Sequence, residues 1–202
     1  MKNNEKNSTK MNAKDLINVG LFTVLIALAT MITSFVGLLP FLMPFIPVFV
    51  GLVTGPLFML YATKIRKPGM FFICELLCGA LYAITGHGLW TVLSYSVGGF
   101  IGEMFLKKGN YRSINGARLA ISFASISCFG QMLPLYIARE AYNEQLIAQY
   151  GAEFAETCLK WMPTWSFFPI LVLAVVFTFI GCTIGIKMLK KHFVKAGMVK
   201  EF

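Results

Sequence analysis

Long uncharged, apolar runs are the feature of this sequence that most limits what it can fold into. The clearest run, Leu16 to Leu39, extends for 24 residues without a charged side chain, and a helix needs about 20 apolar residues to cross a bilayer. The core of a signal peptide is shorter, about 7–15 residues, so we interpret this run as a retained membrane helix. Only 13% of the chain is charged, against about 25% in soluble domains. The sequence therefore predicts an integral membrane protein.

Six segments are apolar and long enough to be spanning helices, which predicts an all-α membrane protein. A single membrane domain at 16–191 is expected between polar tails at 1–15 and 192–202. The third and fourth segments meet at Gly86-His87-Gly88, where the glycines permit a tight reversal. One unbroken helix through 69–106 is the competing interpretation, but it is too long for a single crossing. The predicted spans are 16–38, 45–63, 69–86, 88–106, 116–138 and 165–187.

The basic residues predict the orientation of this bundle. All but two of the 18 lysines and arginines lie in the two tails or around the connections after the second and fourth spans. Loops rich in these residues stay in the cytoplasm, so both termini are predicted to be cytoplasmic. The two exceptions, Arg139 and Lys160, then lie on the outer side. The net charge of +9 is interpreted as a topology signal with anionic lipid as its partner, and no nucleic acid is expected to bind.

Three connections, at 37–47, 86–88 and 139–164, are predicted on the outer side. The first, GLLPFLMPFIP, has three prolines and no charge, which predicts a stiff, irregular loop covered by protein or bordering a cavity. In the third, apolar residues recur every four positions, which is typical of an amphipathic helix. This helix either packs on the bundle or serves as a lid. Its stripe consists of Tyr142, Leu146, Tyr150 and Phe154.

Three glycine pairs with G-x3-G spacing fall within the predicted spans. Small residues at this spacing let a neighbouring helix approach closely. The neighbour is either another helix of this chain or a helix of a partner subunit. The pairs are Gly51 and Gly55, Gly98 and Gly102, and Gly181 and Gly185.

Glu75 is the ionisable residue placed well inside a predicted span. A charged carboxylate near the centre of a membrane helix costs about 2.5–3.5 kcal/mol on insertion scales, so Glu75 must face a cavity, find a donor or stay protonated. Tyr82 lies on the same helix face, together with Cys78 and Gly79. Both a functional and a purely structural role are open for Glu75.

Other polar residues are candidates at the ends of the spans. Gln131 and Arg139 share a face of the fifth span that leads outward and would suit a polar or anionic ligand. The alternative for Arg139 is an interfacial side chain that extends to water. Glu103, near the inner end of the fourth span, is expected to pair with Lys107 one turn later.

His87 is predicted to lie at the outer tip between the third and fourth spans. Its glycine neighbours leave the ring unhindered, which suits a ligand contact or metal coordination, although a plain interfacial histidine is equally open. Trp90, Trp161 and Trp165 should fall at a similar depth. They either close a pocket with His87 or form an aromatic belt at the membrane interface.

The motifs of ATP hydrolysis and of common hydrolases are absent from the sequence. Neither GxxxxGK[ST], HExxH nor GxSxG occurs, so the chain is not expected to hydrolyse ATP by a P-loop or to be an enzyme. The five cysteines include no CxxC pair, and we predict neither a structural disulfide, a metal site nor a resident cofactor.

Four stretches of the sequence carry a resemblance to a known family. They are PFLMPFIP at 40–47, GPLFMLYATK at 55–64, TGHGLW at 85–90 and QMLPLYIAR at 131–139. With them the chain resembles, from about residue 12 to 195, the substrate-binding S components of energy-coupling factor (ECF) transporters, in the MptD-type or Trep_Strep branch. The resemblance implies a six-helix bundle that captures a micronutrient outside the cell. It also implies docking on a membrane coupling subunit driven by two cytoplasmic ATPases, with the lipid bilayer as surroundings.

The resemblance further implies roles for two groups of residues. The loop between the first two spans would act as a gate, through Pro40, Phe41, Met43, Pro44 and Phe45. Small residues on the first span would dock on the coupling subunit. Many S components carry Ala-x3-Ala there, whereas this chain has no strict copy of that pattern and offers Gly20, Ala27 and Ala29 instead.

The expected ligand is a vitamin, a vitamin precursor or a haem-like molecule. Haem as a transported ligand would suit His87 or Met132 at the iron and Arg139 or Lys160 at the propionates. Two other functions are open, a stand-alone proton-coupled carrier using Glu75 and a membrane enzyme. The full set of candidate binding residues is His87, Trp90, Glu75, Tyr82, Gln131, Arg139, Trp161 and Trp165.

The charge pattern predicts the result of a labelling experiment in intact cells. A membrane-impermeant reagent should reach the turn at 86–88 and the segment at 140–160 from outside, because basic loops are retained in the cytoplasm. Reaction of either segment only after the cells are opened would contradict the predicted orientation.

Overall fold

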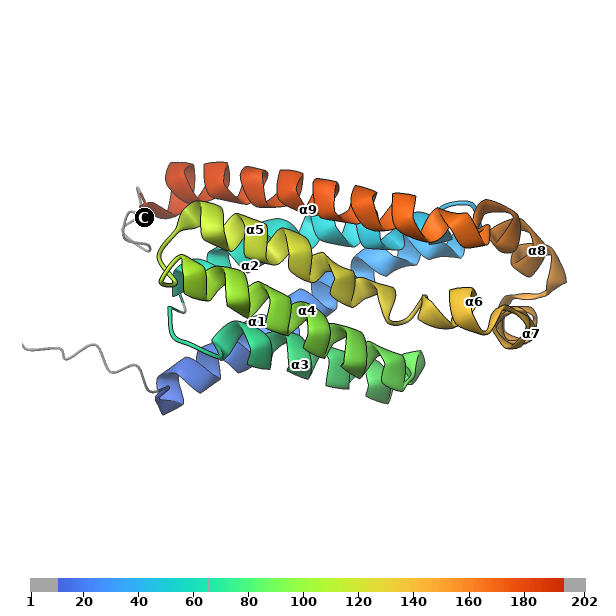
Figure 1. Cartoon of the computed structure of the whole chain (residues 1–202), viewed down its shortest axis with the longest axis horizontal. Coiled ribbons are helices and arrows are strands. Elements are labelled where there is room, and N and C mark those ends of the chain that lie inside the picture. Colours follow the sequence, from blue (N-terminus) through green and yellow to red (C-terminus); the bar gives the residue numbers. More distant parts are fainter. Residues whose placement is uncertain (1–10, 65, 195–202) are drawn as a thin grey trace, which may run out of the picture.

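The computed structural model describes residues 11–64 and 66–194 and shows an elongated bundle of helices (Figure 1). Tail residues 1–10 and 195–202, including Lys2, Lys6, Lys10, Lys195 and Lys200, lie outside the described residues. The helices of the described chain are α1 (Ala13–Ser34), α2 (Ile46–Lys64), α3 (Met70–Tyr82), α4 (Leu89–Lys108), α5 (Ile114–Ala124), α6 (Leu133–Ile137), α7 (Arg139–Tyr150), α8 (Ala152–Trp161) and α9 (Phe167–Met188).

Five helical segments of the described chain are long and apolar enough to cross a membrane. They are Ala13–Leu38, Met43–Lys64, Met70–His87, Leu89–Lys108 and Thr164–Lys191. Large apolar side chains cover their outward faces, for example Ile17 on α1, Phe100 on α4 and Val172 on α9, which are all more than half exposed. Lipid tails are the solvent that such a surface requires. The all-α, membrane-embedded fold predicted from the sequence is therefore confirmed.

The predicted span at 116–138 is not one continuous helix. After α5 the chain passes through a 3-10 segment, Ser125–Phe129, and a turn before the short α6. Ile114–Phe129 is apolar but too short to qualify as a span, since 16 residues at 1.5 Å per residue reach about 24 Å of a core that is about 30 Å thick. The expectation of a single regular helix here was wrong. Hydroxyl groups of the 3-10 segment supply the physical reason, because Ser125 and Ser127 bond to carbonyls three residues back, as in a tighter turn.

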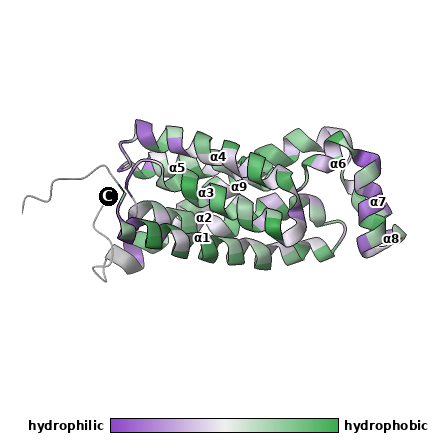
Figure 2. Ribbon diagram, turned by 90° about the horizontal axis from the view of Figure 1, so that it is seen from below, coloured by the Kyte–Doolittle hydropathy of each residue, from purple (hydrophilic) through white to green (hydrophobic). Residues whose placement is uncertain are grey.

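The bundle has two chemically different ends. α1 begins and α9 ends at the same end (Figure 1), and the connections after α2 and α4 lie there too, with most of the described lysines and arginines. We call this the basic end. The opposite end, which we call the capped end, carries the α1–α2 connection, the turn between α3 and α4, and α6 to α8 (Figure 1). Hydrophilic colour in Figure 2 is concentrated at the basic end and on α7, while the helices between are mostly hydrophobic.

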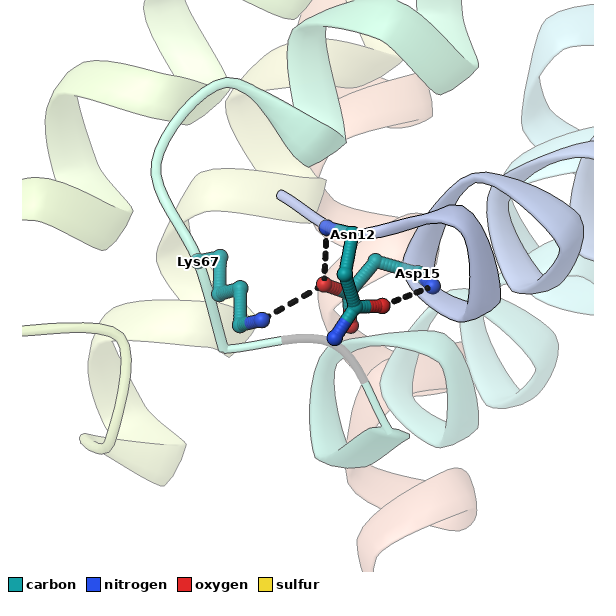
Figure 3. A network of polar contacts seen from close by, with 3 residues as sticks. All are labelled: Asn12, Asp15 and Lys67. Carbon is teal, nitrogen blue, oxygen red and sulfur yellow. Dashed lines mark hydrogen bonds and ion pairs between the residues drawn. The ribbon is translucent and has the colours of Figure 1, made fainter. Parts of the chain in front are cut away.

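A small polar network holds the start of α1 at the basic end (Figure 3). Asn12 Oδ1 accepts from the Asp15 amide at 2.9 Å, and Asp15 Oδ2 accepts from the Asn12 amide at 2.9 Å. This reciprocal arrangement is a capping box. Lys67, from the α2–α3 connection, forms an ion pair with Asp15.

Glu103, on α4, also forms hydrogen bonds at the basic end. Its carboxylate accepts from Gly69 N and Tyr111 Oη, instead of pairing with Lys107 as expected.

The reversal at Gly86-His87-Gly88 is confirmed, and the alternative of one helix through 69–106 was wrong. Gly86 has φ 96° and Gly88 has φ 77°, values that glycine adopts without a steric penalty.

The loop at 37–47 is confirmed as irregular and consists of short 3-10 turns, Phe35–Leu38 and Met43–Phe45. The amphipathic stripe predicted at 142–154 is divided between two helices, because the chain turns at Gly151 with φ 90°.

The glycine pairs are confirmed as sites of close packing within the chain. α2 lies against α9, and the two glycine pairs on these helices face each other. A Cβ on Gly55 would stand 2.7 Å from the Cys182 amide nitrogen, and one on Gly181 would stand 2.5 Å from the Leu52 carbonyl oxygen. Both contacts are with backbone, which cannot move aside as a side chain can. Gly20, on the partly exposed side of α1, would meet nothing within 4 Å.

This packing predicts that Gly181→Ala destabilises the bundle. The added methyl group must separate α2 from α9, and overpacking of this kind costs about 1–3 kcal/mol. Thermal unfolding in detergent should show a lower midpoint for Gly181→Ala than for the matched variant Gly20→Ala. Equal midpoints for the two variants would contradict the close α2–α9 contact.

Candidate functional site

Glu75 is buried in the middle of the bundle, on α3, with only 2% of its surface exposed. It can lie there because α4 presents a glycine at the contact: a Cβ on Gly99 would stand 2.8 Å from the Glu75 Cβ. Its Oε2 lies 2.7 Å from Ser127 Oγ. Glu75 forms no ion pair with any described residue. A single hydroxyl group, that of Ser127, is therefore the described group that can stabilise a negative charge on Glu75.

The hydrogen bond between Glu75 and Ser127 involves a competition for one proton. Ser127 Oγ also lies 2.7 Å from the Ala124 carbonyl oxygen. A hydroxyl has one proton and can donate to one acceptor at a time. When Ser127 donates to Ala124, the short contact to Glu75 is satisfied by a proton on the carboxyl group, which then donates to Ser127. The site therefore has two proton arrangements within the same heavy-atom geometry.

Glu75 lines a small cavity inside the bundle. All of the long helices contribute to its wall, as do α5 and the 3-10 segment after it. The space is narrow, and in this conformation it has room for roughly one or two water molecules. Its polar and sulfur-bearing walls include Thr30, Thr54, Cys78, Tyr82, Tyr95, Ser125, Ser127, Cys128 and Thr178.

Most hydroxyl groups around this cavity give their protons to the bundle itself. Tyr82 Oη donates to the Ala27 carbonyl at 2.9 Å. Thr54, Ser125 and Thr178 donate to helix carbonyls three or four residues back. Their oxygens remain available as acceptors. None of the described residues that line the cavity is a lysine, arginine or histidine.

A cap of buried residues closes the bundle above the cavity at the capped end. This cap cluster shares Val50 and Cys128 with the cavity wall, so the two are continuous. Cys158 Sγ lies 3.3 Å from Met43 Sδ, which joins α8 to the loop between α1 and α2. Burial raises the pKa of the Cys158 thiol to about 11, so it is uncharged at neutral pH. The cap cluster consists of Ile46, Val50, Cys128, Met132, Leu135, Leu146, Ala155, Cys158 and Met162.

Arg139 fastens the cap. Its guanidinium donates to the Met162 carbonyl at 2.7 Å and to the Leu159 carbonyl at 3.0 Å. Carbonyls at a helix C-terminus lack partners within the helix, and these two are at the end of α8. Arg139 therefore joins the first residue of α7 to the last turn of α8, and the two donors engaged in this way are not directed at the cavity.

The structure brings together some of the predicted site residues and separates others. Glu75 and Tyr82 line the cavity. His87 is exposed beside the edge of the Tyr82 ring, with ring centroids 5.6 Å apart, and Thr85 Oγ1 is 3.2 Å from its Nδ1. Gln131 and Arg139 lie above the cavity and are not part of its lining.

The expected pocket between His87 and the tryptophans is not formed. Trp90, Trp161 and Trp165 are 43%, 55% and 71% exposed, as side chains of an aromatic belt would be. Met132 is buried in the cap cluster, whereas His87 is exposed at the α3–α4 turn. The two side chains considered for a haem iron therefore lie in different environments.

The loop and docking residues also divide into buried and exposed groups. In the loop, Pro44 is buried and Met43 packs against the cap cluster, whereas Phe41 is 45% exposed. Pro40 is half-buried, and Phe45 packs beside Val48 and Phe129 in a separate apolar cluster. Among the docking residues, Gly20 and Ala29 are half-buried, while Ala27 is 6% exposed and faces the core. Ala27 thus belongs to the bundle interior and not to a free surface.

Two residues of this site were not anticipated from the sequence. Ser127 was overlooked because a serine in an apolar run is usually bonded to its own helix, and its contact with Glu75 spans 52 positions of sequence. Tyr95 is 5% exposed and lines the cavity, where its hydroxyl lies 4.0 Å from Cys128 Sγ. The signal that would have identified both is a hydroxyl group in the interior of a span opposite a buried carboxyl.

Comparison with known proteins identifies the family of this chain. Residues 13–195 match the family described as hypothetical bacterial integral membrane protein (Trep_Strep), and the chain belongs to that family. No curated protein and no solved structure matches it. The match supports membrane localisation and covers all of the helices described above.

The geometry of the cap predicts that Arg139→Ala loosens α8. The variant loses two hydrogen bonds from a charged donor, each worth about 1.5–3 kcal/mol. Hydrogen exchange measured by mass spectrometry should become faster in 152–162 and remain unchanged in α2 and α9. The matched control is Lys160→Ala, which removes an exposed cation from the same helix and should leave exchange unchanged. Equal exchange in both variants would show that Arg139 does not fasten the cap.

Proposed function

We propose that this member of the Trep_Strep family is the substrate-capture subunit of an ATP-driven importer of the ECF type. The observation that carries the proposal is the small, mostly apolar cavity around the Glu75 carboxyl group in the centre of the bundle, next to a cap at the end away from the basic residues. A cavity in this position is suited to hold a small molecule taken from outside. The sequence contains no P-loop, so the energy for release would come from another subunit.

The proposal includes six crossings with both termini in the cytoplasm. The fifth crossing is made by α5, the 3-10 segment and α6 together, which run from the basic end to the capped end (Figure 1). Irregular backbone at membrane depth is tolerated where it is covered by protein or borders a cavity. Ser125, Ser127 and Cys128 of this irregular segment do line the cavity.

Opening of the cap gives the ligand its entry route. The backbone turns sharply at Ala138, Gly151 and Met162, which flank α7 and α8. These turns are suited to act as hinges, because a few residues at the ends of elements absorb the change in a hinge motion. Met43 contacts Cys158, so the loop at 37–47 moves with α8 as the gate. When α7, α8 and this loop move away, they expose Val50 and Cys128, the two residues that the cap cluster shares with the cavity wall.

The cargo is a micronutrient of modest size, such as a vitamin or a vitamin precursor. The present cavity has room for roughly one or two water molecules, so either ligand requires the cavity to widen, and a haem-like molecule requires more widening than a vitamin. Release into the cell requires the coupling subunit and its two ATPases. The partly exposed side of α1 that carries Gly20 and Ala29 is the proposed docking face.

Glu75 favours one alternative function, a proton-coupled carrier that works alone. Buried carboxyl groups in membrane spans are typical of proton pathways, and this one has the two proton arrangements described above. A carrier of this kind takes up its substrate into liposomes without any partner, and Glu75→Gln abolishes that uptake. No observation favours a membrane enzyme to the same degree, since His87 is exposed at the α3–α4 turn, where Thr85 and Tyr82 are its neighbours.

The importer proposal predicts a stable complex with the coupling subunit and two ATPases. Co-expression followed by purification in nanodiscs should recover all components together. Gly20→Leu and Ala29→Leu should lower that recovery without lowering the thermal midpoint of the isolated chain, because both residues lie on the partly exposed side of α1. Val172→Leu on the lipid-facing side of α9 is the matched control. Full recovery of the complex with both variants would contradict the proposed docking face. Failure of the wild-type chain to form a complex would contradict the importer proposal as a whole.

A further inference from the structure

The cavity around Glu75 offers acceptors for hydrogen bonds and one carboxyl group. Glu75 Oε1 accepts no hydrogen bond from any described residue, although the residue is 2% exposed. Oε1 is not among the fully buried atoms of the described residues that lack a partner, so it faces the space of the cavity. The oxygen therefore marks a position where a donor from a bound molecule can be accepted.

No described residue donates to this oxygen, and most hydroxyl groups of the wall are engaged elsewhere. The hydroxyl protons of Thr54, Tyr82 and Thr178 are engaged by carbonyls of the bundle. The ionisable side chains facing the cavity are the thiols Cys78 and Cys128, the phenols Tyr82 and Tyr95, and Glu75 itself. All five are neutral or negative at any pH, so no described group of the wall can compensate an anion.

We propose that this cavity binds the ammonium end of a primary amine, with Glu75 as its counter-charge. The proposal deepens the proposed function and rests on it, since it assigns a chemical class to the captured molecule. An ammonium group is compact and has three donors and no acceptor, which complements a carboxyl group and the hydroxyl oxygens of the wall. Opposite charges in a protein interior attract strongly, and the pair leaves no net charge in the membrane.

The same reasoning excludes anionic ligands from this position. Next to an ionised Glu75, a carboxylate or phosphate would add a second negative charge, and two like charges at close range repel. Next to a protonated Glu75, the same anion would be a charge inside the membrane without a described cation to compensate it. Haem propionates therefore do not enter the cavity. In the empty protein a proton on Glu75, donated to Ser127, takes the place of the cation, so the amine and the proton compete for one carboxyl group.

Chemical labelling of the carboxyl group tests the proposal on the intact chain. A hydrophobic carbodiimide reacts with protonated carboxyl groups within the membrane, and peptide mass spectrometry reports the adduct on each residue. The full chain in nanodiscs is labelled alone, with methylammonium, with benzylammonium, and with benzyl alcohol or benzoate as uncharged and anionic counterparts. An amine can react with a carbodiimide-activated carboxyl group to form an amide, which would lower the amount of carbodiimide adduct. The adduct and the amide on each residue are therefore counted together, so that amide formation is not mistaken for protection.

We expect either amine to slow total modification of Glu75 by about tenfold, which corresponds to about 1.4 kcal/mol. Benzyl alcohol and benzoate should have no effect. Glu103 is an internal control, since its oxygens already accept from Gly69 N and Tyr111 Oη and its labelling should not respond to amines.

Two results would overturn the inference. One is an equal rate at Glu75 with and without both amines, and the other is protection by benzyl alcohol or benzoate as strong as that by benzylammonium. Neither result affects the importer proposal, because that proposal is tested by recovery of the complex with its coupling subunit. If amines protect Glu75 but the chain assembles with no partner, the amine site is supported and the importer proposal is contradicted.

Discussion

The contact between Glu75 and Ser127 is the interaction on which the centre of this structure depends. A carboxyl group in the interior of a membrane bundle is removed from bulk water, and a single hydroxyl at 2.7 Å is the described group that forms a hydrogen bond with it. The contact requires α4 to pass closely beside α3, which Gly99 allows. It also requires Ser127 to lie on a 3-10 segment instead of a regular helix. The irregularity of the fifth predicted span and the buried carboxyl are thus two parts of one arrangement.

The same arrangement relates the cavity to the cap. Cys128 follows Ser127 in the 3-10 segment and belongs to both the cavity wall and the cap cluster. Movement of α7 and α8 therefore acts on the residue next to the one that holds Glu75. Arg139 and the sulfur contact between Met43 and Cys158 hold this cap closed from two sides. A ligand that displaced the cap would at the same time change the surroundings of the carboxyl group.

The sequence was a good guide where one physical rule dominates. Lipid excludes unpaired backbone groups and charges, so apolar runs identified the five long helices, and glycine's access to positive φ identified the turn around His87. It was a poor guide at 116–138, where serine hydroxyls compete with the helix, and it did not decide between a pocket and an aromatic belt for the three tryptophans, which are exposed. The same residue types occur on the surface and in pockets, and only the contacts between residues distant in sequence show in which of the two a side chain lies.

The sequence by itself determined that this chain is an all-α membrane protein, which stretches are apolar, where the basic residues lie along the chain, and that a carboxyl group is placed inside a span. These properties follow from local composition, because the bilayer acts on each segment separately. The tertiary structure alone decided that Ser127 meets Glu75 across 52 positions, that Arg139 caps α8, and that hydroxyl protons turn away from the cavity. Those outcomes depend on which helix faces which, and helix pairing is set by packing between distant residues that no single segment encodes.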